Sequence, residues 1–486
     1  MATAVAELSP SSLWSHFDQL TTVPRPSKKE ERVRAWVFDW ARSHGFETRE
    51  DPAGNIVVAV PATPGRERAP IVVIQSHLDM VCEKNKGVEH DFERDPIRTS
   101  IEDGWVVSEG TTLGADNGIG VAAAMAAATD TDVVHGPMEL LFTVDEETGL
   151  TGAANLDPAL VTGRTLFNLD SEDDGVLCVG CAGGADTCLT LPLKREGAVA
   201  DRVPRRLVLS GLRGGHSGIN IHENRGNAIR LLARLLEDAQ QAGLEFALRD
   251  FSGGDKSNAI PREAEANLLL RSTDLAAWDS HLERWAATLA VELDGIEPAA
   301  RVALLPGDAG GEPLTREAAL RLLRLLLALP HGVLAMSPAI PGLVESSNNL
   351  ASVRCEEHHA TIVTSSRSSL APALESIRAS IRAAGELSGA TWRVGDAYPG
   401  WQPNPNSPIT ELLRGAYRTV WGAEPSVSAV HAGLECGLLG ERIPGMDMIS
   451  FGPTITGAHS PDERVEIAAV ERFWRALKIA LDRFSA

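Results

Sequence analysis

Long apolar runs are missing from this chain of 486 residues. Its most apolar stretches, such as residues 121–128 and 325–329, fall far below the ~18 residues that a membrane-spanning helix needs. The first residues also lack a basic segment followed by an apolar run, which a secretory leader would require. We therefore expect a cytoplasmic protein that does not associate with membranes.

An excess of basic residues is also missing. The chain has 45 Lys and Arg against 66 Asp and Glu, so its formal net charge is -21. The resulting field repels phosphate backbones and anionic membrane surfaces, which argues against nucleic acid as a partner. Such an acidic excess is a common aid to solubility, but clustered carboxylates also hold cations.

Cysteine is scarce, with six residues in the whole chain. This number gives no disulfide framework and fits a reducing compartment. Cys178 and Cys181 form a C-x-x-C pair, but no second pair follows at the spacing of a zinc ribbon. We interpret these two cysteines as small buried residues.

The first part of the chain alternates strand-like and helix-like patterns. An S-x-x-E capping box at Ser27 and Glu30 predicts the start of a helix, and the alanine-rich residues 118–128 predict another. Short apolar runs predict strands at 46–49, 56–60, 71–74, 139–144 and 165–169. This alternation predicts an α/β fold with a mostly parallel sheet.

The middle of the chain has a different character and predicts an inserted α+β lid. Strand patterns at 207–210, 265–271, 301–304 and 360–364 alternate with helical patterns at 225–242, 275–293, 314–329 and 371–384. We expect two similar halves that form one sheet backed by helices. A proline-rich stretch at 398–408 then predicts a linker. The predicted domains are 1–184 and 400–486, two parts of one catalytic domain, with the lid at 185–399.

Ionisable side chains follow directly after three predicted strands of the first domain. His77, the pair Glu146 and Glu147, and Asp170 each stand at such a strand end. A single strand-end carboxylate is usually a helix cap, and a single histidine is usually structural. Three such ends in one sheet are harder to dismiss, because open α/β sheets bind ligands at this edge.

Two further candidates stand beside glycines. Asp116 lies in Gly-Ala-Asp-Asn-Gly, and His459 lies in Gly-Ala-His-Ser-Pro. Glycine allows backbone conformations that aim a neighbouring side chain at a shared point. Neither segment is diagnostic alone.

Eight segments together resemble a known family, in order and over nearly the whole chain. They are SHLDMV, TLGADNGIG, DEETGLTGA, NLDSED, GGHSG, YPGWQPNPNS, HAGLECG and FGPTITGAHSPDER. This set is similar to the zinc-dependent peptidase family that includes carboxypeptidase G, aminoacylase and succinyl-diaminopimelate desuccinylase. Within that family it most resembles the bacterial aminoacyl-histidine dipeptidases.

The resemblance implies two Zn²⁺ ions per chain, with Co²⁺ or Mn²⁺ as substitutes, bridged by the carboxylate of Asp116. His77 and Asp170 would complete one site. Glu147 and His459 would complete the other. Imidazole nitrogen and carboxylate oxygen are ligands that zinc accepts. The family also implies a cis peptide bond after Asp116.

Two other residues of the first domain receive roles by the same resemblance. Glu146 would be the general base that takes a proton from a metal-bound water and returns it to the leaving amine. Asp79 would orient the imidazole of His77.

Residues of the lid would complete the site. His216 in GGHSG matches the family's carbonyl-polarising histidine, and Asn258 and Arg367 resemble residues that touch the substrate backbone and its carboxylate. His431 and Glu435 in HAGLECG are weaker candidates.

The leading hypothesis is therefore hydrolysis of unblocked dipeptides, Xaa-His and broader, with a short peptide as the partner. Alternatives are an amidohydrolase for N-acyl amino acids and a noncatalytic protein that binds metal or peptide on the same scaffold. A two-metal phosphatase is disfavoured because no phosphate-cradling loop accompanies the carboxylates. A homodimer is left open, as is whether His216 acts in its own subunit or in a partner's.

Overall fold

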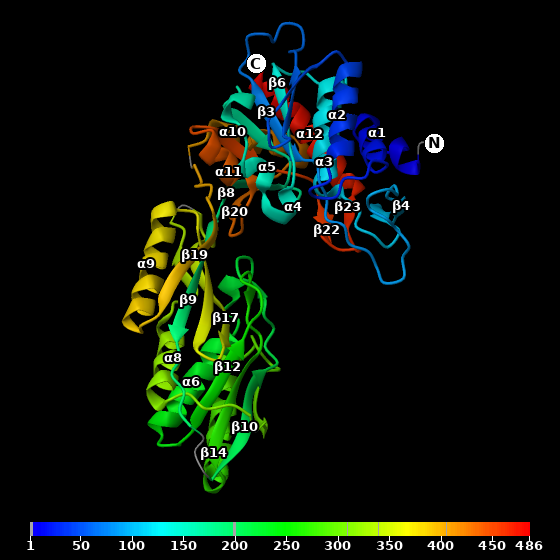
Figure 1. Cartoon of the computed structure of the whole chain (residues 1–486). Helices are drawn as coiled ribbons and strands as arrows, with labels where there is room; N and C mark the ends of the chain where they lie inside the picture. The colour runs from blue at the N-terminus through cyan, green and yellow to red at the C-terminus, as the bar shows by residue number, and fades with distance from the viewer. Residues whose placement is uncertain (1–2, 198–200, 309, 339, 405) are drawn as a thin grey trace. The chain divides into compact units, whose positions relative to one another are not determined.

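A computed structural model describes residues 3–197, 201–308, 310–338, 340–404 and 406–486. The chain divides into two compact units. Unit 1 comprises Met1–Cys181, Trp401–Ala429 and Leu434–Ala486, and unit 2 comprises Ala182–Gly400 and Val430–Gly433. In Figure 1 the blue and red ends of the chain share unit 1, while unit 2 is green and yellow. Unit 2 is thus inserted into unit 1.

The sheet of unit 1 has eight strands in the order β1-β2-β6-β3-β7-β21-β8-β20. Its central strands β6, β3, β7 and β21 are parallel, whereas β1, β2 and β8 pair antiparallel. The bounds are β1 (Glu47–Glu50), β2 (Ile56–Val60), β3 (Val72–His77), β6 (Met138–Thr143), β7 (Thr165–Asn168), β8 (Val176–Cys181), β20 (Ser426–Val430) and β21 (Asp447–Ser450). The α/β class predicted from the sequence is confirmed, with the parallel pairing at the centre of the sheet.

Helices and a small second sheet complete unit 1. The alanine-rich helix α3 is almost wholly buried and contacts β3, and α10 packs against α12. The helices are η1 (Ala4–Glu7), α1 (Ser11–Leu20), α2 (Glu31–Ser43), α3 (Ala115–Thr129), α4 (Glu146–Gly149), α5 (Thr151–Ala154), η2 (Pro158–Leu160), α10 (Pro408–Trp421), α11 (Glu435–Arg442) and α12 (Ile467–Phe484). The second sheet joins β22 (Ile455–Thr456), β23 (Arg464–Glu466), β5 (Trp105–Ser108) and β4 (Thr99–Glu102).

The helix predicted after Ser27 is present as α2, but the predicted capping hydrogen bonds of Ser27 and Glu30 are absent. Helix α2 begins at Glu31, and no side chain caps it. The Ser27 hydroxyl instead donates to Asp79 Oδ2 (2.8 Å), and Glu30 Oε1 accepts from the backbone N–H of Asp145 (3.0 Å). Both side chains are thus used at the ends of β3 and β6 rather than at the helix.

Unit 2 is built on one nine-stranded sheet with the order β15-β10-β14-β12-β17-β18-β9-β19, and β16 pairs with β17. Its strands are β9 (Gly183–Pro192), β10 (Arg202–Ser210), β12 (Ala247–Gly253), β14 (Ala264–Arg271), β15 (Arg301–Pro306), β16 (Gly332–Met336), β17 (Val344–Cys355), β18 (His359–Ser368) and β19 (Thr391–Tyr398). A two-stranded ribbon joins β11 (Gly215–His216) and β13 (Ala259–Ile260).

The helices of unit 2 share one core with this sheet. They are α6 (Ala228–Gln241), α7 (Leu275–Glu292), α8 (Arg316–Ala328) and α9 (Ala371–Leu387), with short turns η3 (Ile221–Glu223) and η4 (Ser272–Asp274). All four α-helices contribute to the same apolar cluster, and Figure 1 shows α6, α8 and α9 along one face of the sheet. The four predicted helices and the single sheet are confirmed; the similarity of the two halves stays a prediction.

One short segment departs from the predicted division of the chain. The sequence assigns residues 430–433 to the catalytic part, but they lie in unit 2. His431 Nε2 lies 2.7 Å from Ser347 Oγ, and Ala182 N donates to Val430 O (3.0 Å), so these contacts hold the segment there. Across the described ranges, no helix is both long enough and apolar enough to cross a membrane.

Candidate metal centre

The three strand-end groups meet at one edge of the unit 1 sheet. His77 is the last residue of β3, Glu146 and Glu147 follow β6, and Asp170 follows β7. Because β3 is parallel to both neighbours, with His77 opposite Thr143, the strands end at the same edge. The side chains of His77 and Glu147 are buried, with 1% and 3% exposed.

Two tight turns bring the remaining candidates to this edge. Asp116 stands at the start of α3 after Gly114, whose φ is +71° and whose Cβ would lie 2.5 Å from Arg25 Nη2. The Asp116–Asn117 peptide bond is cis, as the resemblance implied. His459 lies between β22 and β23 and has a φ of +63°.

Asp116 lies between the two histidines. Its Oδ1 is 3.2 Å from His77 Nε2, and its Oδ2 is 3.2 Å from His459 Nε2. His77 Nε2 is also 3.3 Å from Asp170 Oδ1, and His459 Nε2 is 3.0 Å from Glu147 Oε2. The five predicted ligands therefore form two groups that share Asp116, and in each group the ligand atoms lie within 4.8 Å of one another.

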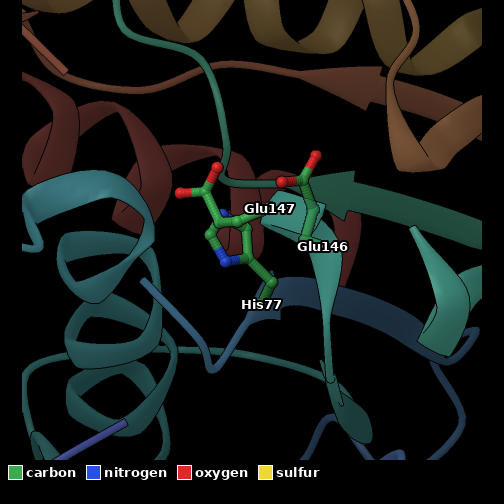
Figure 2. Close-up of side chains that lie close together, drawn as sticks. All are labelled: His77, Glu146 and Glu147. Atoms are coloured by element: carbon green, nitrogen blue, oxygen red, sulfur yellow. The ribbon is translucent and has the colours of Figure 1, made fainter. Parts of the chain in front are cut away.

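Glu146 and Glu147 stand side by side above His77 (Figure 2). One potential ligand atom from each of the three residues also lies within 4.8 Å of the others. Glu147 Oε1 is buried and has no hydrogen-bond partner among the described residues. A buried carboxylate oxygen without a partner is costly, and a cation is the group that would satisfy it.

The carboxylates favour positive charge at this place. Burial by itself lowers the pKa of His77, but Asp170, Asp116 and Asp79 raise it well above its usual value. Hydrogen bonds to Asp116 and Glu147 raise the pKa of His459 to about 11. Histidine and carboxylate donors of this kind, arranged around a shared carboxylate, fit two divalent cations.

Asp79 supports both the histidine and the acidic pair. Its Oδ1 lies 3.4 Å from His77 Nδ1, on the side of the ring away from Asp116. Its two oxygens also accept the backbone N–H groups of Glu146 (3.0 Å) and Glu147 (3.2 Å). The fully buried carboxylate of Asp79 therefore fixes the ring of His77 and the start of α4 together.

Glu146 stands outside the two groups that share Asp116. It belongs only to the group with His77 and Glu147, not to either group built on Asp116. Burial raises the pKa of Glu146 well above its usual value, helped by the charges of Asp170 and Glu435.

His216, predicted to polarise the substrate carbonyl, lies in unit 2. Its Nδ1 accepts the backbone N–H groups of Gly218 (3.2 Å) and Ile219 (3.1 Å). Burial and the charge of Arg367 lower the pKa of His216. The neutral ring must then carry its proton on Nε2, so that nitrogen is a hydrogen-bond donor.

The other lid candidates also belong to unit 2. Arg367 is buried on β18, where its Nη1 donates to the hydroxyl of Tyr398 (2.6 Å) and its Nε has no partner within the described ranges. Asn258 is exposed, and its backbone oxygen accepts from Ser217 N (2.8 Å), next to His216. The structure thus brings Asn258 to the His216 turn and places Arg367 where its charge acts on His216.

A family model and a curated relative each match most of this chain. The model of "Peptidase family M20/M25/M40" matches residues 73–483. The chain belongs to this family. The cytosol non-specific dipeptidase of Escherichia coli (strain K12) is 41% identical over 484 residues, 99% of this chain and 99% of that protein. As a member of family M20/M25/M40, the chain is a peptide hydrolase.

Solved structures share the fold of this family member. Aminoacylhistidine dipeptidase from Vibrio alginolyticus has a TM-score of 0.93 at 40% identity, covering 99% of this chain and 98% of that chain. Aminopeptidase PepT from Bacillus cereus has a TM-score of 0.59 at 17% identity, covering 99% and 100%. The second likeness concerns the fold alone.

The sequence did not reveal several residues that support this centre. Arg25 and Glu463 bind the backbone around Asp116, and neither stands in a pattern that predicts such a role. Glu435, a weak candidate from its motif, lies in unit 1, where its Oε2 accepts from Gln75 Nε2 (2.6 Å) and Thr143 Oγ1 (2.8 Å). Burial raises the pKa of Glu435 to about 7.

Proposed function

We propose that this member of family M20/M25/M40 is a dizinc dipeptidase that hydrolyses unblocked dipeptides, among them Xaa-His. The observation that carries the proposal is the pair of donor groups that share Asp116, one with His77 and Asp170 and the other with Glu147 and His459. Two buried oxygens of the donor set support it: Glu147 Oε1 and Asp170 Oδ1 have no hydrogen-bond partner among the described residues, and cations would satisfy both.

Zinc ions at these positions would polarise the scissile carbonyl and lower the pKa of the attacking water. We assign the proton transfers to Glu146, which takes a proton from that water and delivers it to the leaving amine. Its position suits both steps, because Glu146 lies beside His77 and Glu147 but outside the two groups that share Asp116. The contact between Asp79 Oδ1 and His77 Nδ1 would keep the imidazole of His77 oriented.

We assign carbonyl binding to His216 and carboxylate binding to Arg367, with Asn258 contacting the substrate backbone. The Nε2–H of a neutral His216 can donate to an oxygen that becomes negative during attack. The guanidinium of Arg367 suits the C-terminal carboxylate of a dipeptide, because its planar fork binds both oxygens. Unit 2 would thus act as a lid that closes over the substrate.

The choice of dipeptides over other amides rests on the relatives. The proteins from E. coli and V. alginolyticus carry the names cytosol non-specific dipeptidase and aminoacylhistidine dipeptidase. We extend that substrate class to this chain, together with a cytoplasmic location and a homodimer as the candidate assembly.

The test is a set of matched substrates assayed with the purified protein. Free-amine dipeptides, including an Xaa-His peptide, are compared with their N-acetylated forms before chelation, after chelation and after return of zinc. We expect cleavage of the free-amine forms, loss on chelation and recovery with zinc. Cleavage of the acetylated forms alone would establish the amidohydrolase alternative, and binding without turnover of either would establish a noncatalytic protein.

A further inference from the structure

The carboxylate of Glu463 accepts hydrogen bonds from four consecutive backbone N–H groups. Its Oε2 accepts from Leu113 (2.7 Å) and Gly114 (2.9 Å), and its Oε1 accepts from Ala115 (2.7 Å) and Asp116 (3.2 Å). Glu463 is buried, with 3% exposed. Both oxygens are therefore occupied by the turn that carries Asp116, in a place that water does not reach.

This arrangement requires a carboxylate. The four N–H groups lie at and just before the non-helical backbone of Asp116 and Asn117, where the regular turns of α3 have not begun, so they need an acceptor outside the helix. A carboxylate offers two acceptor oxygens, and hydrogen bonds to a charged acceptor are stronger than neutral ones. Glu463 thereby fixes the backbone at Asp116 itself, not only the residues before it.

The same loop that supplies Glu463 supplies His459. Glu463 N donates to Ser460 O (3.1 Å), and Ser460 N donates to Gly457 O (3.2 Å), so the loop is folded on itself. Gly457 is needed there, because its φ is +70° and a Cβ would lie 2.6 Å from the backbone oxygen of Asp462. The loop therefore contacts the Asp116 turn twice, through Glu463 and through His459.

Arg25 ties the opposite side of that turn to the segment after β3. Its guanidinium donates to the backbone oxygens of Leu78 (3.0 Å), Asp79 (2.8 Å) and Gly114. Arg25 is also buried, with 3% exposed. The carbonyl of Gly114 is thus held by Arg25 while its N–H is held by Glu463.

We propose that Glu463 is a positioning residue for the metal centre, and that it holds the Asp116 turn against the His459 loop so that both ion sites are assembled before metal binds. The inference rests on the proposed function, since it assumes that Asp116 and His459 are ligands. When the ligands are already in place, metal binding does not have to provide the free energy needed to order them, so the affinity is higher. Removal of Glu463 should therefore weaken metal binding in addition to any loss of stability.

The test substitutes Glu463→Gln, which keeps the shape and loses the charge. One end of the amide is an NH₂ group, so two of the four N–H donors would face a donor. We expect the zinc affinity, measured by competition with a chromophoric chelator, to fall about 10- to 100-fold, the usual effect of removing a group that holds a ligand. The zinc-induced rise in Tm should shrink accordingly.

Glu139→Gln is the matched control. Glu139 is equally buried, with 3% exposed, and accepts the N–H groups of Thr162 (2.9 Å) and Gly163 (2.9 Å) near the start of β6, away from the strand ends that carry the centre. We expect this variant to lower the Tm of the metal-free protein while its zinc affinity stays at the wild-type value.

Wild-type zinc affinity in Glu463→Gln, combined with a Tm loss like that of Glu139→Gln, would overturn the proposal and leave Glu463 a structural residue. If Glu463→Gln does not fold, Glu463→Asp takes its place, because the shorter carboxylate keeps the charge but cannot reach all four donors. Unchanged zinc affinity in Glu463→Asp would then be the contradicting result. A wild-type protein that binds no zinc would instead contradict the proposed function.

Discussion

The histidines of the candidate metal centre and those near Arg367 have pKa values shifted in opposite directions. In unit 1, carboxylates raise the pKa of His77 well above its usual value and that of His459 to about 11. In unit 2, burial lowers the pKa of His216 and lowers that of His431 to about 4, and Arg367 adds to both shifts. Imidazole therefore faces carboxylates at the metal centre of unit 1 and a guanidinium at the Arg367 site of unit 2.

This difference indicates which kind of group each of the two sites suits. A cluster that stabilises a protonated imidazole also stabilises a divalent cation in place of the proton. A cluster of neutral imidazoles around a buried guanidinium instead suits an anion, such as a substrate carboxylate or a developing oxyanion.

Substitutions of the acidic pair should separate metal binding from proton transfer. We expect Glu146→Gln to lower kcat about 10²- to 10⁴-fold, because it removes the general base, with zinc content unchanged. Glu147→Gln should lose bound zinc, because its carboxylate lies 3.0 Å from His459 Nε2 in the group that shares Asp116. Turnover and zinc content by elemental analysis of the same samples check both statements. Zinc loss in the first variant and retention in the second would mean that the two roles are exchanged.

Removal of His216 should affect turnover and leave the metal in place. We expect His216→Ala to lower kcat about 10²- to 10³-fold, the range seen when one oxyanion donor is lost. His222→Ala is the control, because this exposed histidine lies in the following turn η3. Steady-state kinetics and zinc analysis check the prediction, and equal kinetics for the two variants would remove His216 from the site.

Arg367 should control recognition of the substrate carboxylate. We expect Arg367→Gln to raise KM for a dipeptide about ten- to a hundredfold, since a charge-assisted hydrogen bond contributes about 1.5–3 kcal/mol. For the same dipeptide with a C-terminal amide, wild type and variant should differ little. A variant that still prefers the free carboxylate as strongly as wild type would place carboxylate binding elsewhere.

Acid should weaken unit 2 through its neutral histidines. Burial, with a contribution from Arg230, lowers the pKa of His331 to about 4 from 6.5. Below pH 6.5 the unfolded chain binds a proton at this residue, whereas the folded protein does so only near pH 4. The free energy of unfolding is therefore highest above pH 6.5 and falls by about 1 kcal/mol per pH unit as the pH is lowered toward 4. His331→Asn keeps an acceptor for Leu350 N and should flatten the fall in Tm between pH 6.5 and 4. A Tm profile as steep as that of wild type would contradict this assignment.

The sequence predicted those residues of the candidate centre that directly follow a strand pattern and have metal-binding side chains. His77 and Asp170 directly follow apolar runs, and parallel strands bring such residues to one edge, so their meeting needs no knowledge of the loops. The Ser27 capping box failed because the hydroxyl has a stronger partner in Asp79, which is distant in sequence. The role of Glu463 could not be predicted for the same reason, since its four donors lie about 350 residues earlier in the chain.

Anomalous diffraction from crystals of the zinc-loaded protein tests the central claim most directly. The shared carboxylate of Asp116 predicts two zinc peaks, roughly 3.5–4 Å apart, one beside His77 and Asp170 and one beside Glu147 and His459. A single peak, or two peaks that do not both contact Asp116, would contradict the dinuclear centre on which this account depends.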